Sequence, residues 1–186
     1  MKKTLVLGLI LTAGLSGGAH AHVDLCEKFC YGRGYLGADL LVQNISANWA
    51  SFRGLHPRIA LGYADWSNKY YFAGELFYIP VTMVLSDIRG NREGSTAKAS
   101  NSFGASLLPG VIFKSFLGYL RLSLLYSRFV APNSMRLGAQ LGLGLQKMIL
   151  TSLAVRGEYI YTAYGSVAKI GTPNSNELGL GLIYFF

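Results

Sequence analysis

Large apolar residues and small or polar residues alternate along most of this chain, most clearly at its C-terminal end. Every second residue from Leu178 to Phe186 is large and apolar, and the other face of the strand carries Glu177, two glycines, Ile183 and Phe185. A period of two is typical of a β-strand whose faces meet different surroundings. A soluble domain rarely ends on such a strand because its edge promotes aggregation, whereas a barrel in lipid requires one.

The same alternation recurs in earlier segments of about ten residues separated by turn-rich stretches. The expected strands are residues 35–44, 57–64, 70–81, 102–113, 119–127, 137–146, 152–161 and 176–186. In most of them one face is apolar and uncharged, and the other mixes Gly with Arg, Glu and Asp. A soluble barrel of lipocalin type would have the opposite polarity. The pattern therefore predicts an all-β fold, an eight-stranded antiparallel up-and-down transmembrane β-barrel.

The connections between these strands alternate in length. Residues 45–56, 82–101, 128–136 and 162–175 form long connections, and those near 65–69, 114–118 and 147–151 form short ones. This asymmetry is typical of short periplasmic turns and longer extracellular loops, with both termini in the periplasm.

The N-terminus has the pattern of an export signal. Lys2 and Lys3 precede an apolar run, and Ala19-His20-Ala21 fits the cleavage rule, so residues 1–21 are expected to be a cleaved signal peptide. The apolar run is too short to span a bilayer. We expect residues 22–34 to be a periplasmic segment, residues 35–186 to be the barrel, and the mature protein to lie in the cell outer membrane.

Cys26 and Cys30 are the only cysteines and lie just after this cleavage site. In an oxidising periplasm a disulfide between them is the first expectation. Free thiols or an intermolecular bridge is the second, and a metal site with His22 is the third, so we assign no metal ligand.

The net charge of +8 does not indicate nucleic acid, because the chain carries an export signal and no nucleic-acid motif. The long connections contain more Arg and Lys than Asp and Glu. Phosphates of lipopolysaccharide are the simplest partners for such loops, and host glycans or serum proteins are the alternative. No cofactor is expected.

Inward-facing positions carry most of the remaining charge. The expected lumen charge network consists of Asp39, Arg58, Glu75, Arg121, Arg156, Glu158 and Glu177. An eight-stranded barrel is just wide enough for side chains to fill, and isolated charges in its interior cost several kcal/mol, so these groups should pair and close the lumen. The alternative is a narrow ion path, because Gly138, Gly142, Gly144, Gly179 and Gly181 also face inward and could leave a cavity.

Aromatic residues gather near the expected strand ends. Two interfacial girdles are predicted, one from Tyr63, Trp66, Tyr70, Phe113 and Tyr119, the other from Tyr126, Tyr159 and Tyr161. A lipid A-modifying enzyme would need a serine beside a histidine, and His56 is the one candidate in the barrel segment, predicted to be solvated in a loop. No local serine motif supports catalysis, so we predict that the protein is not an enzyme.

Several segments together resemble the small outer-membrane β-barrel family, the OmpA/OmpX-type eight-stranded barrels and their opacity-like relatives. These segments are residues 35–39, 59–63, 70–76 and 156–159 and the C-terminal strand, where Leu182, Tyr184 and Phe186 resemble the signal read by the barrel-assembly machinery. The resemblance implies the fold and the outer membrane. It leaves the function open among surface structure, envelope integrity or adhesion by a monomer with a closed lumen, a narrow porin-like channel, and a lipid A-modifying enzyme.

Overall fold

The computed structural model describes residues 32–47, 51–88, 98–130, 133–167 and 171–186. The signal peptide and the segment with Cys26 and Cys30 lie outside the described residues, so the expectations for them remain predictions. The described part of the chain has no helix long and apolar enough to cross a membrane.

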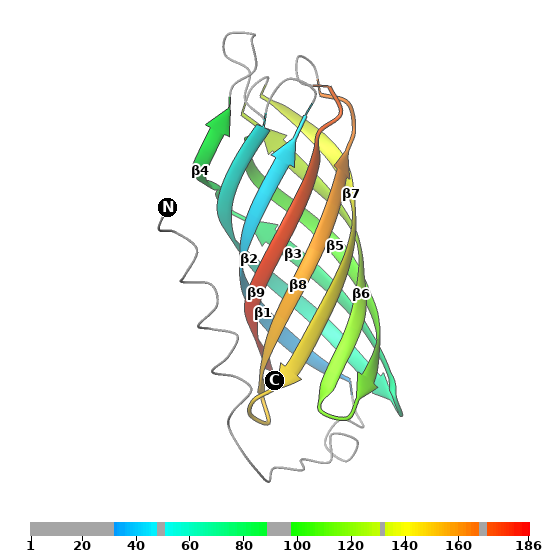
Figure 1. Ribbon diagram of the computed structural model, residues 1–186. Coiled ribbons are helices and arrows are strands. Elements are labelled where there is room, and N and C mark those ends of the chain that lie inside the picture. Colours follow the sequence, from blue (N-terminus) through cyan, green and yellow to red (C-terminus); the bar gives the residue numbers. More distant parts are fainter. Residues whose placement is uncertain (1–31, 48–50, 89–97, 131–132, 168–170) are drawn as a thin grey trace.

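Eight strands close into one antiparallel barrel (Figure 1). The barrel strands are β1 (Arg33–Ser46), β2 (Ser51–Ser67), β3 (Tyr70–Ile79), β5 (Ala99–Phe113), β6 (Phe116–Phe129), β7 (Ser134–Met148), β8 (Leu153–Tyr164) and β9 (Asn174–Phe185). A short additional strand, β4 (Met83–Ile88), pairs with β2. Each barrel strand pairs with its neighbours in the chain, and β1 pairs with both β2 and β9 to close the wall. The predicted fold is confirmed, including the strand from 176 onward.

The prediction of a long connection at 45–56 is wrong. Strand β2 begins at Ser51, and Ser46 pairs with Ser51, so the hairpin extends well beyond the expected start of the strand at residue 57. The first part of β2 escaped the pattern because its polarity is reversed: Phe52 is buried inside the barrel, while Arg53 is exposed. An outer face with a charge is expected only where a strand rises above the lipid.

The connection expected at 82–101 contains the short strand β4. Pro80 cannot donate a ladder hydrogen bond, and β3 ends one residue before it. After this break β4 pairs with the upper part of β2, where Met83 lies opposite Leu55. The strand that follows β2 in the wall is therefore made of two pieces, β3 and β4. The second piece, β4, lies at the loop end beside β2 (Figure 1).

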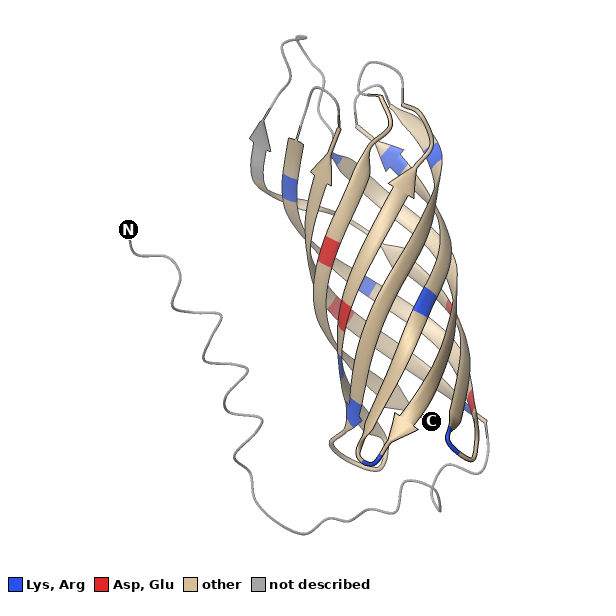
Figure 2. Cartoon of the chain, turned by 45° about the vertical axis from the view of Figure 1, so that its right-hand side comes forward, with Lys and Arg blue, Asp and Glu red and all other residues tan. Residues whose placement is uncertain are grey.

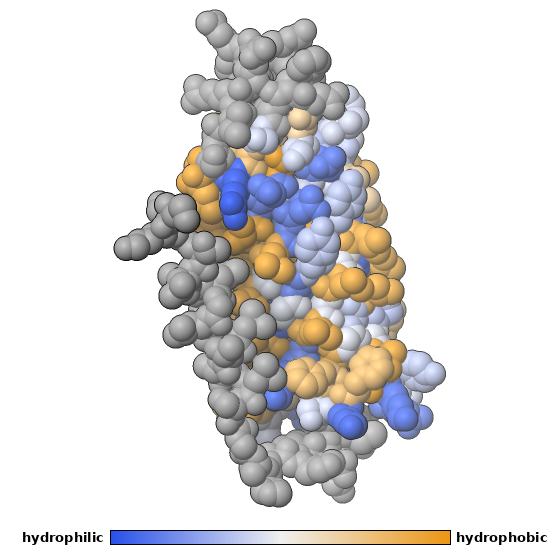
Figure 3. Space-filling model, in the orientation of Figure 1, coloured by the Kyte–Doolittle hydropathy of each residue, from blue (hydrophilic) through white to orange (hydrophobic). Residues whose placement is uncertain are grey.

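We call the end with the tight turns at 68–69, 114–115 and 149–152 the turn end, and the opposite end the loop end. Between them the outer wall is an apolar surface, here called the outer belt. On β6 it runs from Phe116 to Tyr126, which at about 3.3 Å per residue and a tilt of about 40° spans roughly 25 Å. On the face that Figure 3 shows, apolar side chains lie along much of the wall, and the strongly hydrophilic ones are concentrated toward its two ends. This height matches the hydrocarbon layer crossed by membrane barrels.

The lumen is packed in layers. At the turn end lies an apolar and aromatic layer that includes Tyr35, Trp66, Tyr71, Tyr119 and Phe185. Trp66 and Tyr119 were expected in the interfacial girdle, and that assignment is wrong, because both rings point inward and are buried. Along a strand neighbouring residues face opposite sides, so proximity to a turn does not determine which side an aromatic ring takes.

The loop end of the lumen has a second apolar layer. It includes Phe77, Leu125, Phe129 and Tyr164, with Phe129 and Tyr164 in edge-to-face contact at 5.2 Å between ring centroids. A smaller cluster of Ile45, Phe52 and Ala99 lies further toward the loops. The charged residues of the lumen therefore lie between two apolar layers.

Candidate functional site: a charged ring in the lumen

Charged side chains lie inside the barrel midway along its strands. Figure 2 marks acidic and basic positions on the middle of the wall. The side chains at these positions are buried, because each occupies an inward position of the two-residue alternation. The members are Asp39 (β1), Arg58 (β2), Glu75 (β3), Arg121 (β6), Arg156 (β8) and Glu158 (β8).

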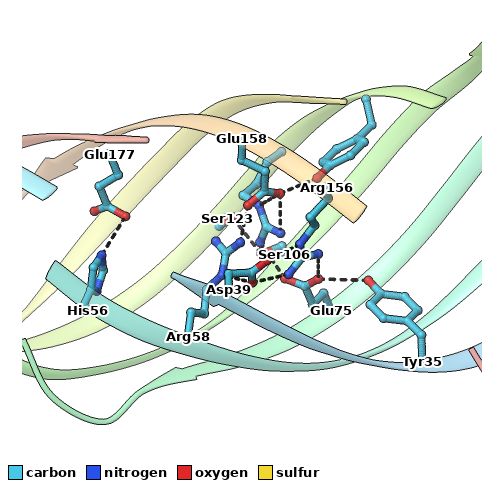
Figure 4. A network of polar contacts seen from close by, with 12 residues as sticks. Tyr35, Asp39, His56, Arg58, Glu75, Ser106, Ser123, Arg156, Glu158 and Glu177 are labelled. Atoms are coloured by element: carbon cyan, nitrogen blue, oxygen red, sulfur yellow. Dashed lines mark hydrogen bonds and ion pairs between the residues drawn. The ribbon is translucent and has the colours of Figure 1, made fainter. Parts of the chain in front are cut away.

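These six side chains form a closed cycle in which arginines and carboxylates alternate (Figure 4). We call this cycle the charged ring. Arg58 pairs with Asp39 at 2.9 Å and with Glu158. Arg121 pairs with Glu158 at 2.8 Å and with Glu75 at 2.7 Å. Arg156 closes the cycle through Asp39 at 2.5 Å and Glu75 at 2.7 Å. Every member thus contacts two partners of opposite charge.

The geometry of the ring satisfies most of its polar atoms. Arg156 donates from Nε and Nη2 to the two oxygens of Asp39 at 2.6 and 2.5 Å, a bidentate pair. Tyr119 donates its hydroxyl to Glu158 at 2.6 Å, and Tyr35 donates to Glu75 at 3.1 Å. The aromatic layer at the turn end therefore supports the ring through two hydroxyl groups.

Serines on the neighbouring wall complete the contacts. Arg121 donates from Nη1 to Ser106 Oγ at 2.7 Å, and Ser123 donates to the same oxygen at 2.9 Å. Because three arginines face three carboxylates, the ring is neutral as a unit. A buried ionic cluster is tolerated when every charge is paired and hydrogen-bonded, which is the condition met here.

The inward glycines make room for large side chains rather than leaving a cavity. A methyl group added at Gly144 would collide with the Tyr119 ring, and one added at Gly181 would collide with the carboxylate of Asp39. At Gly138 it would meet Tyr164 and Leu125, and at Gly179 it would meet Leu41. The open space that the glycines suggested is thus occupied.

A second polar site lies on the loop side of the ring. His56 Nε2 and Glu177 Oε2 are 3.6 Å apart, and both side chains are almost completely buried. The expectation that His56 is a solvated loop residue is wrong, because β2 extends over it and turns it inward. Gln43 donates from Nε2 to Glu177 Oε1 at 2.9 Å. Glu177, expected in the same network as the arginines, instead belongs to this separate site.

The geometry around His56 does not assemble a serine nucleophile. No hydrogen bond joins His56 to a serine among the residues that the structure describes. Within those residues, no group of three or more His, Cys, Asp or Glu side chains is placed to hold a metal ion. Sequence reasoning missed the Tyr35, Tyr119, Ser106 and Ser123 contacts, since none of these residues stands out by type.

The C-terminal strand closes the barrel against β1. Leu182 pairs with Ala38 and Tyr184 with Leu36, and their side chains are exposed on the outer belt. Phe186 lies just beyond β9, where its backbone N–H donates to Gly34 at 3.0 Å. The role of these three residues as an assembly signal remains a prediction.

No protein-family model matches the chain, and no curated protein sequence matches it. Among solved structures, that of Neisserial surface protein A is similar, with a TM-score of 0.54 and 21% identity over 82% of this chain and 97% of that chain. Ail, the attachment invasion locus protein of Yersinia pestis, is similar with a TM-score of 0.53 and 14% identity over 83% and 99% of the two chains. Ail in complex with the heparin analogue sucrose octasulfate has a TM-score of 0.51, at 14% identity over the same shares. The fold is thus that of a small eight-stranded outer-membrane β-barrel, as the resemblance implied.

Proposed function

We propose that the protein spans the bacterial outer membrane as a monomer with a closed lumen and acts through its loop end at the cell surface, in surface structure, envelope integrity or adhesion. The outer belt supports the location, since its height fits the hydrocarbon layer and its residues are uncharged. The observation that carries the closed lumen is the charged ring. Its six members fill the middle of a barrel too narrow to hold both them and a water path.

The apolar layers on both sides of the ring add to the barrier against ions. An ion crossing from the turn end would have to pass Trp66, Tyr71 and Phe185, whose rings pack at centroid distances of 5.4 and 5.6 Å. It would then have to separate ion pairs that are shielded from water, which costs several kcal/mol for each charge left unpaired.

Single-channel recording of the mature protein, refolded and inserted in a planar bilayer, tests this proposal. A heat-modifiable gel shift establishes folding beforehand. A silent bilayer is expected for the unaltered protein and for Asp65→Asn, a matched change of an exposed carboxylate at the turn end. Reproducible openings that change size or selectivity in Glu75→Gln would make the lumen a transport path and overturn the closed-lumen proposal.

We further propose that the loop end binds an anionic polymer or the phosphates of lipopolysaccharide. Arg53 and Arg128 are exposed there, and the loops between strands add further Arg and Lys. The Ail structure with a heparin analogue supports this class of ligand, because it shows a sulfated molecule on a barrel of the same fold.

Binding to immobilised heparin at increasing salt tests this second proposal. The double variant Arg53→Gln with Arg128→Gln should elute from heparin at lower salt than the parent protein. It has lost two exposed positive charges, and the attraction of such charges to an anionic polymer is screened by salt. Lys69→Gln with Lys114→Gln removes the same charge from the turn end and should elute with the parent. Equal elution of all three proteins would refute the loop-end site.

A further inference from the structure

Arg136 is an inward-facing arginine at the loop end of β7. It lies between Met135 and Leu137, whose side chains are exposed on the outer wall, so its own side chain takes the opposite face. Its ladder partner on β6 is Ser127, which is completely buried. The alternation of the strand therefore turns Arg136 toward the lumen and away from the surrounding membrane.

The carboxylates of the lumen are already paired with other bases. Each of the three carboxylates in the charged ring is bound by two arginines, and Glu177 faces His56. Within the part of the chain that the structure describes, Arg136 takes part in no ion pair. A charge that is partly withdrawn from water is costly unless a counterion compensates it. An anionic ligand would supply the counterion that these residues do not.

Two hydrogen-bond donors on this face of β7 lack acceptors. Arg136 Nε and Ser134 Oγ are both shielded from solvent, and neither has a hydrogen-bond partner. Ser134 also faces inward, since its ladder partner is the buried Phe129. Residues two apart on a strand project from the same face about 6.6 Å from each other, so one oxyanion can contact both. Buried polar atoms without a partner are rare, and a guanidinium Nε can only donate, so the missing group is an acceptor.

Arg128, on the neighbouring strand β6, has the opposite arrangement. Its side chain is exposed on the outer wall, and its Nε donates to Asn133 Oδ1 at 2.9 Å. In the membrane position proposed above, Arg128 faces the lipid headgroups, whereas Arg136 lies on the other side of the wall. A ligand for Arg136 must therefore approach from outside the cell through the loop end, and the phosphates of the surrounding lipopolysaccharide do not reach it.

We infer that Arg136 and Ser134 bind a sulfate ester of a soluble sulfated glycan at the loop end of the lumen. A sulfate ester carries a single negative charge, which balances one arginine, and its free oxygens can accept from both the guanidinium and the Ser134 hydroxyl. A phosphate monoester carries about −1.5 to −2 charges and would leave a surplus. The inference rests on the proposed binding of anionic ligands at the loop end, and it adds an inward-facing site to the outward-facing Arg53 and Arg128.

Binding of sucrose octasulfate, measured by isothermal titration calorimetry in a zwitterionic detergent at about 0.15 M salt, tests the inference. The parent is the refolded mature protein, and the heat-modifiable gel shift establishes folding of every variant. Arg136→Gln should weaken binding at least about tenfold, because a hydrogen bond to a charged group is lost together with the charge. Ser134→Ala should weaken binding about fivefold, the effect of one neutral hydrogen bond.

Two comparison variants separate this site from general charge attraction. Arg128→Gln makes the same substitution on the outward face of the neighbouring strand and should weaken binding by less than about threefold, because an exposed charge is screened. Lys114→Gln removes a charge from the turn end and should bind as the parent does. If Arg136→Gln weakens binding no more than Arg128→Gln, the inward site is refuted.

A parent that does not bind sucrose octasulfate would also overturn the inference, and the heparin column then decides the wider proposal separately. Retention of the parent through Arg53 and Arg128 would leave the loop-end proposal standing, whereas a parent that is not retained would remove both. Arg136→Lys serves if Arg136→Gln does not fold. It keeps the charge but lacks the planar fork of the guanidinium, so it should bind at least about threefold more weakly, and an affinity equal to that of the parent would overturn the inference.

Discussion

Removing one charge from the ring should destabilise the barrel far more than removing a surface charge. We choose Glu158→Gln, since this carboxylate is paired with Arg58 and Arg121 and accepts the Tyr119 hydroxyl at 2.6 Å. The amide keeps the shape but leaves the ring with one uncompensated positive charge. Breaking a buried ion pair in this way costs about 3–5 kcal/mol of unfolding free energy. Against a typical total of about 5–15 kcal/mol, this loss is easily measured.

Urea unfolding in lipid vesicles provides the measurement, with Trp66 fluorescence as the probe. The chain has two tryptophans, so a Trp49→Phe background leaves Trp66 as the single emitter. Trp66 lies in the aromatic layer at 5.4 Å from Tyr71, so its emission changes when the lumen opens. The matched control is Asp65→Asn, the same carboxylate-to-amide change at an exposed position, for which less than about 0.5 kcal/mol is expected.

A second variant tests whether the cost comes from the charge imbalance. Glu158→Gln with Arg58→Gln restores a neutral lumen, so its cost should be smaller than the sum of the two single changes by about 1–3 kcal/mol. A single-variant cost below about 1 kcal/mol, or strict additivity of the two changes, would refute the reasoning. In that case the ion pairs would contribute no more than any polar filler of the lumen.

Three further changes test the packing inside the lumen, the contact of the outer belt with lipid, and the assembly signal. Gly144→Ala should cost about 1–3 kcal/mol in urea unfolding because its methyl group meets the Tyr119 ring, whereas Gly74→Ala, which meets nothing, should be neutral or stabilising. Leu143→Arg on the outer belt should cost about 2–4 kcal/mol in vesicles, and a neutral result would speak against lipid contact there. Phe186→Ala should reduce assembly in cells, measured as the heat-modifiable fraction, while leaving the refolded protein stable; unchanged assembly would remove it from the assembly signal.

The sequence predicted most of the wall because the two faces of each strand meet different surroundings. Leu137 to Gln146 alternates without an exception, and the structure extends this strand only to Ser134 and Met148. The inward charges were found for the same reason, since a charged residue in an otherwise apolar strand must take the other face. The alternation was lost where a strand leaves the lipid, as in the first part of β2.

Which inward-facing charges pair with one another could not be predicted in the same way. Alternation places Asp39, Glu75 and Arg121 inside, but it does not say which strands face one another across the barrel. Asp39 and Arg58 are direct neighbours in the ladder, while Arg121 reaches Glu75 from a strand that does not pair with β3. Such contacts depend on the curvature of the closed wall and on side-chain length, and neither is encoded in a two-residue period.

The ring has a consequence for how the strands are aligned. Its members come from five strands, and shifting any one of them by one residue would move its charge to the outer belt, because neighbouring residues face opposite sides. For an arginine at mid-belt such a shift would cost about 2–4 kcal/mol in lipid. The shift would also leave the partners of that charge unpaired in the lumen. Apolar lumen residues impose a much weaker penalty, since a leucine is accepted on either face. The charged ring therefore selects one register for the whole wall, which a sealed barrel lined only by apolar residues would not achieve.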